Sequence, residues 1–251
     1  MKNSKLKDIL LVIAATLIII ACVIITVVIT SRPLNNKDNN DNEINTTEDI
    51  YNAYSVPIIK KEIDWKALKE RSENVYAWIY IPGTAIDYPI VQHPTELSFY
   101  LTRDIDGTDS DHGSIFTDYY NSTGWNGRNT VVYGRNMEDG SMFATLHNYE
   151  NKDFFDKNQY IYIYTPEDTI VYQVYAAYNF NDDYIPLSYN MVNNDSFKEY
   201  LDLAFSANGM TDHSRKDSIK PVDALCHIIT LSTGIKGQED RRWIVQGVRL
   251  N

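Results

Sequence analysis

A long apolar run near the N-terminus constrains this chain more than any other feature. Residues 9–30 contain no charged side chain, and a membrane-spanning helix needs about 20 such residues. Lys2, Lys5 and Lys7 precede the run, whereas the segment after Arg32 is rich in Asn and Asp. Because basic residues favour the cytoplasmic side, we expect a single-pass anchor with the N-terminus inside and the C-terminal part outside.

Two other interpretations of the run compete with an uncleaved anchor. A cleaved signal peptide has a shorter apolar core, of about 7 to 15 residues, followed by a small-residue cleavage site. The sequence Ile19-Ile20-Ala21-Cys22 is similar to a lipobox, which would make Cys22 a lipid-bearing N-terminus. Residues 23–29 remain apolar beyond that cysteine, which favours the anchor. All three interpretations place the following domain outside the membrane.

The composition divides the chain into four parts. Between the anchor and the domain lies a polar, Asn-rich and Asp-rich spacer that cannot bury enough apolar surface to order itself. The sequence therefore predicts a cytoplasmic basic tail (1–8), a transmembrane anchor (9–30), a flexible linker (31–51) and an extracellular domain (52–251).

Charge and residue usage exclude several classes of function. The net charge of -11 argues against nucleic acid as a partner, because phosphate neutralisation requires a basic surface. Two cysteines, one of them in the apolar run, provide no disulfide framework. The histidines show no zinc-binding spacing, so neither a metal nor another cofactor is expected.

Hydrophobic periodicity predicts a mainly β domain with few helices. Asp64 is a suitable N-cap for a helix over residues 65–72, and Ser196 is suitable for a helix over residues 197–205. Pro89 marks its strand as an edge or a kink. Strands are expected at 76–81, 85–91, 113–116, 130–133, 159–164, 170–178, 225–233 and 242–248, with a polar loop over 234–241. Many short strands with few helices indicate a closed or nearly closed barrel.

Two segments of the domain carry a specific motif. Thr230-Leu231-Ser232-Thr233-Gly234 is followed eight residues later by Arg242, and further upstream lies Tyr133-Gly134-Arg135-Asn136-Met137. Together they resemble the active-site frame of the class B sortases, which are cell-surface cysteine transpeptidases of Gram-positive bacteria. In that family the segments read T-L-S-T-C, ending in the nucleophile, and Y-G-H-N-M, carrying the catalytic histidine.

The resemblance extends from about residue 60 to the C-terminus and includes the segments W-I-Y-I-P-G-T and G-S-I-F in the same order. It implies an eight-stranded β-barrel with an N-terminal helix and one helix before the last two strands. It also implies a cell-surface location and a groove for the sorting-signal peptide of a surface protein or for a peptidoglycan precursor.

The reacting groups of the family are absent from this sequence. Gly234 occupies the cysteine position and Arg135 the histidine position, so that Arg242 is the only retained member of the triad. Glycine cannot form an acyl-enzyme, and arginine stays protonated at physiological pH. Thr230, Ser232 and Thr233 are candidates for the groove, but they lack a visible base and suit strand packing or backbone hydrogen bonding.

One other cysteine lies in the predicted domain. If residues 225–233 form one strand, Cys226 and His227 point to opposite faces, and Cys226 lies roughly 26 Å along the strand from Gly234, at about 3.3 Å per residue. We therefore expect Cys226 to be an ordinary buried thiol.

Three hypotheses for the function follow. The first is a catalytically inactive sortase-like protein that acts as a peptide-binding or regulatory module, in which Arg135 and Arg242 favour an anionic guest unless Glu138, Asp139, Glu239 or Asp240 neutralises them. The second is a working transpeptidase that anchors surface proteins to peptidoglycan with an unrecognised nucleophile. The third is an engineered or damaged copy, since each substitution requires one nucleotide change.

Overall fold

A computed structural model of the chain describes residues 56–206, 211–214 and 220–251. The predicted basic tail, anchor and linker lie outside the described residues. Within the described ranges, no helix is both long and apolar enough to cross a bilayer. The chain separates into two compact units, and the second, Tyr51–Asn251, contains every element described below.

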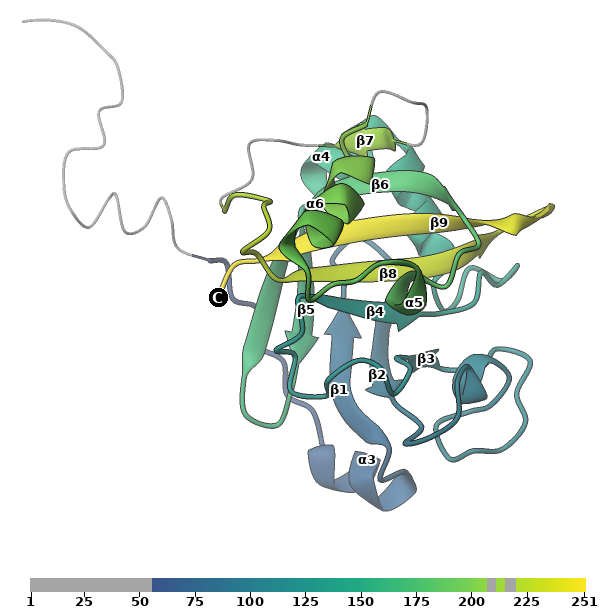
Figure 1. The fold of residues 1–251 in the computed structure, drawn as a ribbon. Coiled ribbons are helices and arrows are strands. Elements are labelled where there is room, and N and C mark those ends of the chain that lie inside the picture. The colour runs from purple at the N-terminus through teal and green to yellow at the C-terminus, as the bar shows by residue number, and fades with distance from the viewer. Residues whose placement is uncertain (1–55, 207–210, 215–219) are drawn as a thin grey trace, which may run out of the picture. The chain divides into compact units, whose positions relative to one another are not determined.

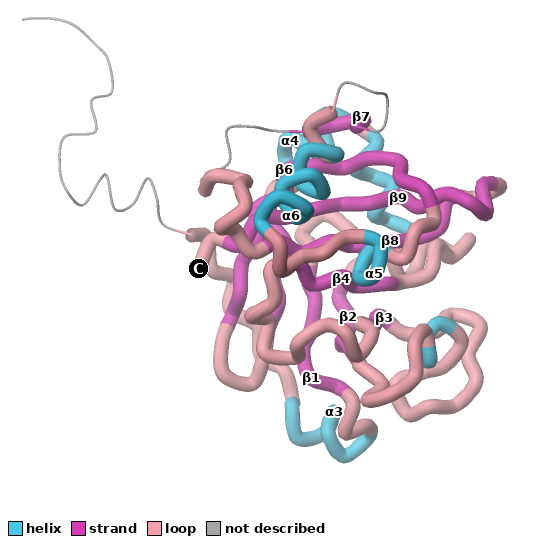
Figure 2. Tube along the Cα trace, in the orientation of Figure 1, coloured by secondary structure: helices cyan, strands magenta, loops and turns pink. Residues whose placement is uncertain are grey.

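Eight strands form a closed barrel, which confirms the predicted eight-stranded β-barrel. The ring runs β5-β1-β2-β3-β4-β8-β9-β6 and closes through the antiparallel pairing of β6 with β5, while β7 extends from β6 as a ninth strand. Figures 1 and 2 show the strands wrapped into this barrel and joined by long loops. The strands are β1 Val75–Tyr80, β2 Asp87–Val91, β3 Ile115–Phe116, β4 Asn129–Tyr133, β5 Tyr160–Tyr164, β6 Thr169–Asn181, β7 Thr211–Ser214, β8 Ile228–Ile235 and β9 Gln238–Arg249.

The helices lie outside the barrel. They comprise α3 Trp65–Arg71, α4 Lys152–Lys157, α5 Ile185–Ser188, α6 Asn194–Leu203 and the 3-10 helices η1 Phe99–Leu101 and η2 Ala144–Glu150. The predicted cap of α3 is confirmed, because the Ala67 amide donates to Asp64 Oδ1 at 2.9 Å. The predicted cap of α6 is wrong: Asn193 accepts from the amides of Asp195 and Ser196, so the helix begins three residues earlier than expected.

The predicted loop over residues 234–241 is also wrong. The register pairs Gly234 with Arg242 and Ile235 with Gln238, so β8 and β9 continue into a tight hairpin. Gly237 adopts a φ of +76°, a conformation that glycine tolerates and that suits a two-residue turn. The polar composition that suggested a loop instead belongs to exposed strand ends, and this hairpin projects from the barrel at the right of Figure 1.

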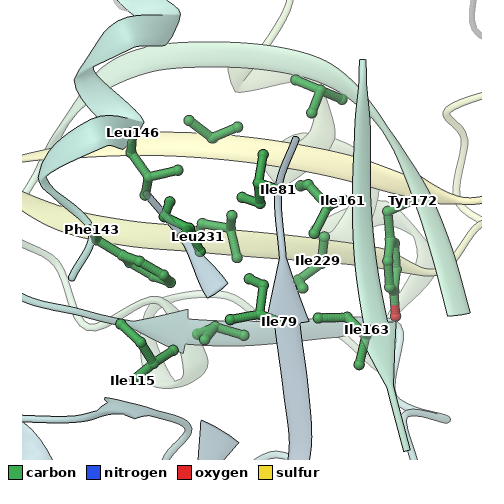
Figure 3. Close-up of a cluster of buried hydrophobic side chains, with 14 of the residues drawn as sticks. Ile79, Ile81, Ile115, Phe143, Leu146, Ile161, Ile163, Tyr172, Ile229 and Leu231 are labelled. Atoms are coloured by element: carbon green, nitrogen blue, oxygen red, sulfur yellow. The ribbon is translucent and has the colours of Figure 1, made fainter. Parts of the chain in front are cut away.

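Alternation along the strands builds two layers of apolar packing. In β8, Ile229 and Leu231 point into the barrel, where they join the cluster drawn in Figure 3. Ile228 points outward and packs beneath α6 with Phe197 and other apolar residues. Truncating such a fully buried leucine to alanine typically lowers the free energy of unfolding by about 2–5 kcal/mol. The strand ends therefore extend from a tightly packed core.

Pro89 lies within β2, where the prediction placed an edge or a kink. It pairs with Trp78 of β1, whereas β3 pairs with β2 only through Ile90 and Val91. The proline therefore has a neighbouring strand on one side only, which its missing N–H requires.

Two glycines near the barrel rim make a matched test of the packing. A Cβ at Gly134 would lie 2.6 Å from Ile115 Cδ1 and 2.6 Å from Phe143 Cγ, whereas a Cβ at Gly234 meets nothing within 4 Å. We predict that Gly134→Ala lowers the free energy of unfolding by about 1–3 kcal/mol through overpacking. Gly234→Ala should change it by less than about 0.5 kcal/mol. Urea denaturation of both variants measures this, and equal losses would contradict the packing described here.

Candidate active site

A groove opens at one end of the barrel where β4, β8 and β9 end. Its volume is about 1060 Å³, which makes it large enough for a short peptide. Its floor includes Tyr133, Ser232 and Thr233, and its walls come from the β2–β3 connection around Ser98 and the start of α5 around Tyr184.

Strand pairing brings the three sequence-predicted positions together. The parallel ladder of β4 on β8 aligns Tyr133 with Ser232, and the Gly134 amide donates to Ser232 O at 3.2 Å. The antiparallel ladder of β8 on β9 places Gly234 opposite Arg242. Arg135 follows directly after Gly134, so that Arg135, Gly234 and Arg242 all line the groove although they are distant in the sequence.

Gly234 leaves an open position in this groove. Gly234 belongs to β8, at the point where the register with β9 shifts, and an added Cβ would enter free space. Position 234 can therefore hold a side chain that faces the groove. The local structure around position 234 is therefore not collapsed onto the glycine.

Two side chains contact the carbonyl of Gly234: Asn136, which lies in the motif but was assigned no role, and His147, which lies outside the motif. Asn136 Nδ2 donates to Gly234 O at 3.0 Å, and His147 Nε2 lies 3.0 Å from the same oxygen. His147 Nδ1 lies 2.6 Å from Glu150 Oε1, and its ring stacks on Trp243 with centroids 5.8 Å apart. No sequence signal links these residues, because η2 and β8 meet only in the folded barrel.

The protonation state of His147 decides how this contact is made. Glu150 and the Gly234 carbonyl both accept hydrogen bonds, so the charged imidazolium can donate to both. A neutral ring that keeps its proton on Nδ1 for Glu150 can instead accept from Asn136 Nδ2, which is 3.1 Å from Nε2. In either state the ring braces the end of β8 and does not line the groove.

The two arginines have no carboxylate partner in the described part of the chain. Arg242 Nη1 donates to the main-chain oxygens of Glu239 and Arg241, each at 2.8 Å. Two of the carboxylates expected to neutralise the arginines are engaged elsewhere. Glu138 binds Lys236 at 2.8 Å, and Asp139 lies 3.1 Å from His112 Nε2.

The groove candidates separate into two groups. Ser232 and Thr233 line the groove, and Thr233 Oγ1 is buried without a hydrogen-bond partner in the protein. Thr230 is fully buried beneath α6, where its hydroxyl donates to Asn129 Oδ1 at 2.9 Å, so it lies outside the groove. Thr230 lies on the same side of β8 as Ser232 and Gly234 but four residues before Gly234, where α6 covers the outer face of the barrel and Tyr200 Oη lies 3.2 Å from its hydroxyl.

Cys226 lies away from the groove. It precedes β8 and lines a separate cavity of about 460 Å³. Burial raises the pKa of its thiol to about 11, so the thiolate required of a nucleophile is scarce at neutral pH. The thiol is partly buried, and the neighbouring His227 directs Nδ1 to Gly127 O at 2.9 Å and not to the sulfur.

A metal site would be built from the acidic, histidine and cysteine side chains of the described residues. No group of three or more His, Cys, Asp or Glu side chains there could hold an ion. Two of the histidines lie against single carboxylates, His147 against Glu150 and His112 against Asp139.

A closed eight-stranded barrel with a groove at the ends of β4, β8 and β9 defines a fold that solved structures share. Clostridium perfringens sortase B is 28% identical to this chain, with a TM-score of 0.66 over 74% of this chain and 99% of that one. Sortase B from B. anthracis, solved in complex with AAEK1, is 27% identical, with a TM-score of 0.63 over 80% of this chain and 93% of that one.

Sequence comparison assigns the family. The family model of the sortase domain matches residues 79–249. Sortase B of Listeria monocytogenes is 30% identical over 72% of this chain and 71% of its own length. Sortase B of Staphylococcus aureus is 29% identical over 55% of this chain and 56% of its own length. The chain therefore belongs to the sortase family, and its relatives are of class B.

The loop after Arg135 gives a testable pH dependence. The Ser141 hydroxyl and amide donate to Asp139 Oδ1 at 2.6 and 2.9 Å, and with the weaker contact to His112 they lower the pKa of Asp139 to about 2. Because the folded pKa lies below the ordinary value of 3.8, this stabilisation is present above pH ~3.8 and is lost as the pH falls through ~2. We predict that Ser141→Ala raises this pKa toward 3.8 more than His112→Ala does. Carboxyl ¹³C titration by NMR measures both shifts, and the reverse order would contradict the assignment.

Proposed function

We propose that this chain is a membrane-anchored, catalytically inactive class B sortase-like protein that binds a sorting-signal peptide at the cell surface. The observation that carries the proposal is the pairing of an intact groove with an open position at Gly234. Sortases act on the sorting-signal peptides of surface proteins, so the retained groove favours the same class of ligand here. A regulatory role would follow from peptide binding without cleavage.

The chemistry of the family explains why inactivity is expected. Acyl transfer needs a thiolate that attacks the peptide carbonyl and a proton donor that releases the amine. Gly234 offers no attacking atom, and the guanidinium of Arg135 cannot exchange a proton near neutral pH. Loss of such groups typically lowers the rate by a factor on the order of 10⁴ to 10⁶.

No described neighbour supplies a substitute. The hydroxyl of Ser232 lines the groove, but no histidine does, so it has no adjacent base. The two ring nitrogens of His147 lie against Glu150 Oε1 and the main-chain oxygen of Gly234, so this histidine does not face Ser232. Cys226 cannot serve as the nucleophile, because the pKa of its thiol is raised and it lines a different cavity.

The groove retains features that suit a peptide. Its walls are apolar and aromatic at Leu101, Phe116 and Tyr184, and polar groups lie at the strand ends. Pockets of this size with a few fixed polar groups are typical of ligand sites. The guanidiniums of Arg135 and Arg242 add affinity for a carboxylate on the bound peptide, because both stand in the groove without a described ion pair.

Peptide binding is tested with the soluble unit, residues 52–251, and candidate pentapeptide sorting signals. We predict measurable binding by isothermal titration calorimetry. Gly234→Phe should abolish binding, because its ring fills the open position, while the matched Gly234→Ala keeps it. If no candidate peptide binds to the wild type or to Gly234→Ala, the groove does not recognise a sorting signal and the proposal is contradicted.

Restoration of the missing groups tests the inactive state. We predict that the double variant Gly234→Cys with Arg135→His cleaves a fluorogenic sorting peptide at a rate at least about 10³ times that of the wild type. Each single variant should stay near the background, because the thiol and the imidazole act as a unit. Cleavage by the wild type at the rate of the double variant would favour the alternative, a working transpeptidase.

A further inference from the structure

A buried carboxylate joins the two walls of the groove. Asp118 is 2% exposed and follows the short strand β3. Its Oδ1 accepts from the Ser98 amide at 2.7 Å, and its Oδ2 accepts from the Tyr184 hydroxyl at 2.8 Å. Ser98 and Tyr184 both line the groove, although they belong to connections on different sides of it.

Each partner lies at a structurally sensitive point of its wall. Ser98 has a φ of 53°, in the left-handed region that non-glycine residues rarely adopt, and it immediately precedes η1. Tyr184 is the N-cap residue of α5, and its main-chain oxygen accepts from the amides of Leu187 and Ser188. The Asp118 carboxylate therefore holds the first residue of both wall segments.

Asp118 itself is fixed to the barrel. Its main-chain oxygen accepts from Gln92 Nε2 at 3.0 Å and from Asn121 Nδ2 at 3.1 Å. Asn121 Oδ1 in turn accepts from the Val131 amide of β4 at 2.9 Å. Asp118 is thus hydrogen-bonded through Asn121 to β4, the strand that also carries Tyr133 of the groove floor. Its carboxylate can therefore set the position of both walls relative to that floor.

The electrostatics favour a strong bridge. A buried carboxylate requires hydrogen bonds to offset its lost hydration, and donors to a charged acceptor form the stronger kind of hydrogen bond. Burial, with the bond to Asp118, raises the pKa of Tyr184 above its ordinary value of 10.0, so its hydroxyl remains a donor throughout the physiological range. The ring of Tyr184 also lies parallel to that of Tyr133 in the floor, at a centroid distance of 6.4 Å.

We propose that Asp118 is a positioning residue that couples the two walls of the groove, so that the affinity for a bound peptide depends on the Ser98–Asp118–Tyr184 bridge. The inference about affinity rests on the proposed peptide-binding function. The bridge itself is independent of any ligand. Asp118 does not itself line the groove and acts through Ser98 and Tyr184, which do.

Hydrogen exchange of the full-length chain tests the bridge without a ligand. Asp118→Asn replaces one of the two acceptor oxygens with a donor, and we expect protection to fall about tenfold or more at the Ser98 amide and also at Leu187 and Ser188. Tyr184→Phe removes one hydroxyl and should affect the α5 amides with little effect on Ser98. The control Tyr164→Phe loses a comparable hydroxyl bond, to Ile59 O at 2.9 Å, outside the groove, and should change neither wall.

Peptide affinity supplies the second readout. We expect Tyr184→Phe to weaken binding of the pentapeptide by about tenfold at an unchanged thermal midpoint, and Tyr164→Phe to leave affinity unchanged. Unaltered affinity in Tyr184→Phe, or unaltered exchange at the α5 amides in Asp118→Asn, would overturn the coupling. If the wild type binds no peptide, the proposed function fails, and the exchange experiment still decides whether the walls are coupled. Should Asp118→Asn not fold, Tyr184→Phe keeps both readouts.

Discussion

The parallel pairing of β4 with β8 is the constraint on which the rest of the site depends. Parallel strands run in the same direction, so their ends meet at one rim of the barrel, and there the segments after Tyr133 and Ser232 lie side by side. The antiparallel partner β9 then adds Arg242 opposite Gly234. Three residues that are far apart in the sequence thus share one groove, and their positions follow from main-chain hydrogen bonds and not from their own chemistry.

Because main-chain pairing sets these positions, the residues at 135 and 234 can vary without a change in the barrel. A Cβ added at Gly234 would meet nothing within 4 Å, so glycine at this position leaves no cavity in the core. Asn136 and His147 hold the main-chain oxygen of Gly234, a contact that exists for any residue at this position. Arg135 is half-buried at the rim, where a longer side chain can extend without displacing the barrel. By contrast, Gly134 cannot accept even a methyl group.

Much of the fold was predictable because local patterns and tertiary packing agree. The alternating residues of β5 and β6 predicted strands that the barrel contains, and Asp64 caps α3 as expected. The hairpin over residues 234–241 was missed because its exposed strand ends are polar, and polarity alone does not separate a solvated strand from a loop. The start of α6 was missed because Asn193, Asn194 and Ser196 are all suitable caps, and only tertiary packing selects among them.

The site was predictable only as far as its motif extended. The positions of Arg135, Gly234 and Arg242 came from a resemblance in sequence, whereas Asn136 and His147 reach Gly234 through contacts between elements that no local pattern encodes. Asp118 was hidden for the same reason, since its two partners belong to separate connections. Thr230 was assigned to the groove by its place in the motif. It lies four residues before Gly234 on β8, where it is fully buried beneath α6.

The proposed function requires that the wild-type groove binds a peptide without cleaving it or forming an acyl-enzyme. The most direct measurement is intact-protein mass spectrometry after incubation of the wild-type domain, residues 52–251, with a sorting-signal peptide that it binds. We expect unmodified protein and intact peptide at every time point. An acyl-enzyme adduct, or a peptide cut at the sorting motif, would contradict it and identify the chain as an enzyme with a different attacking group.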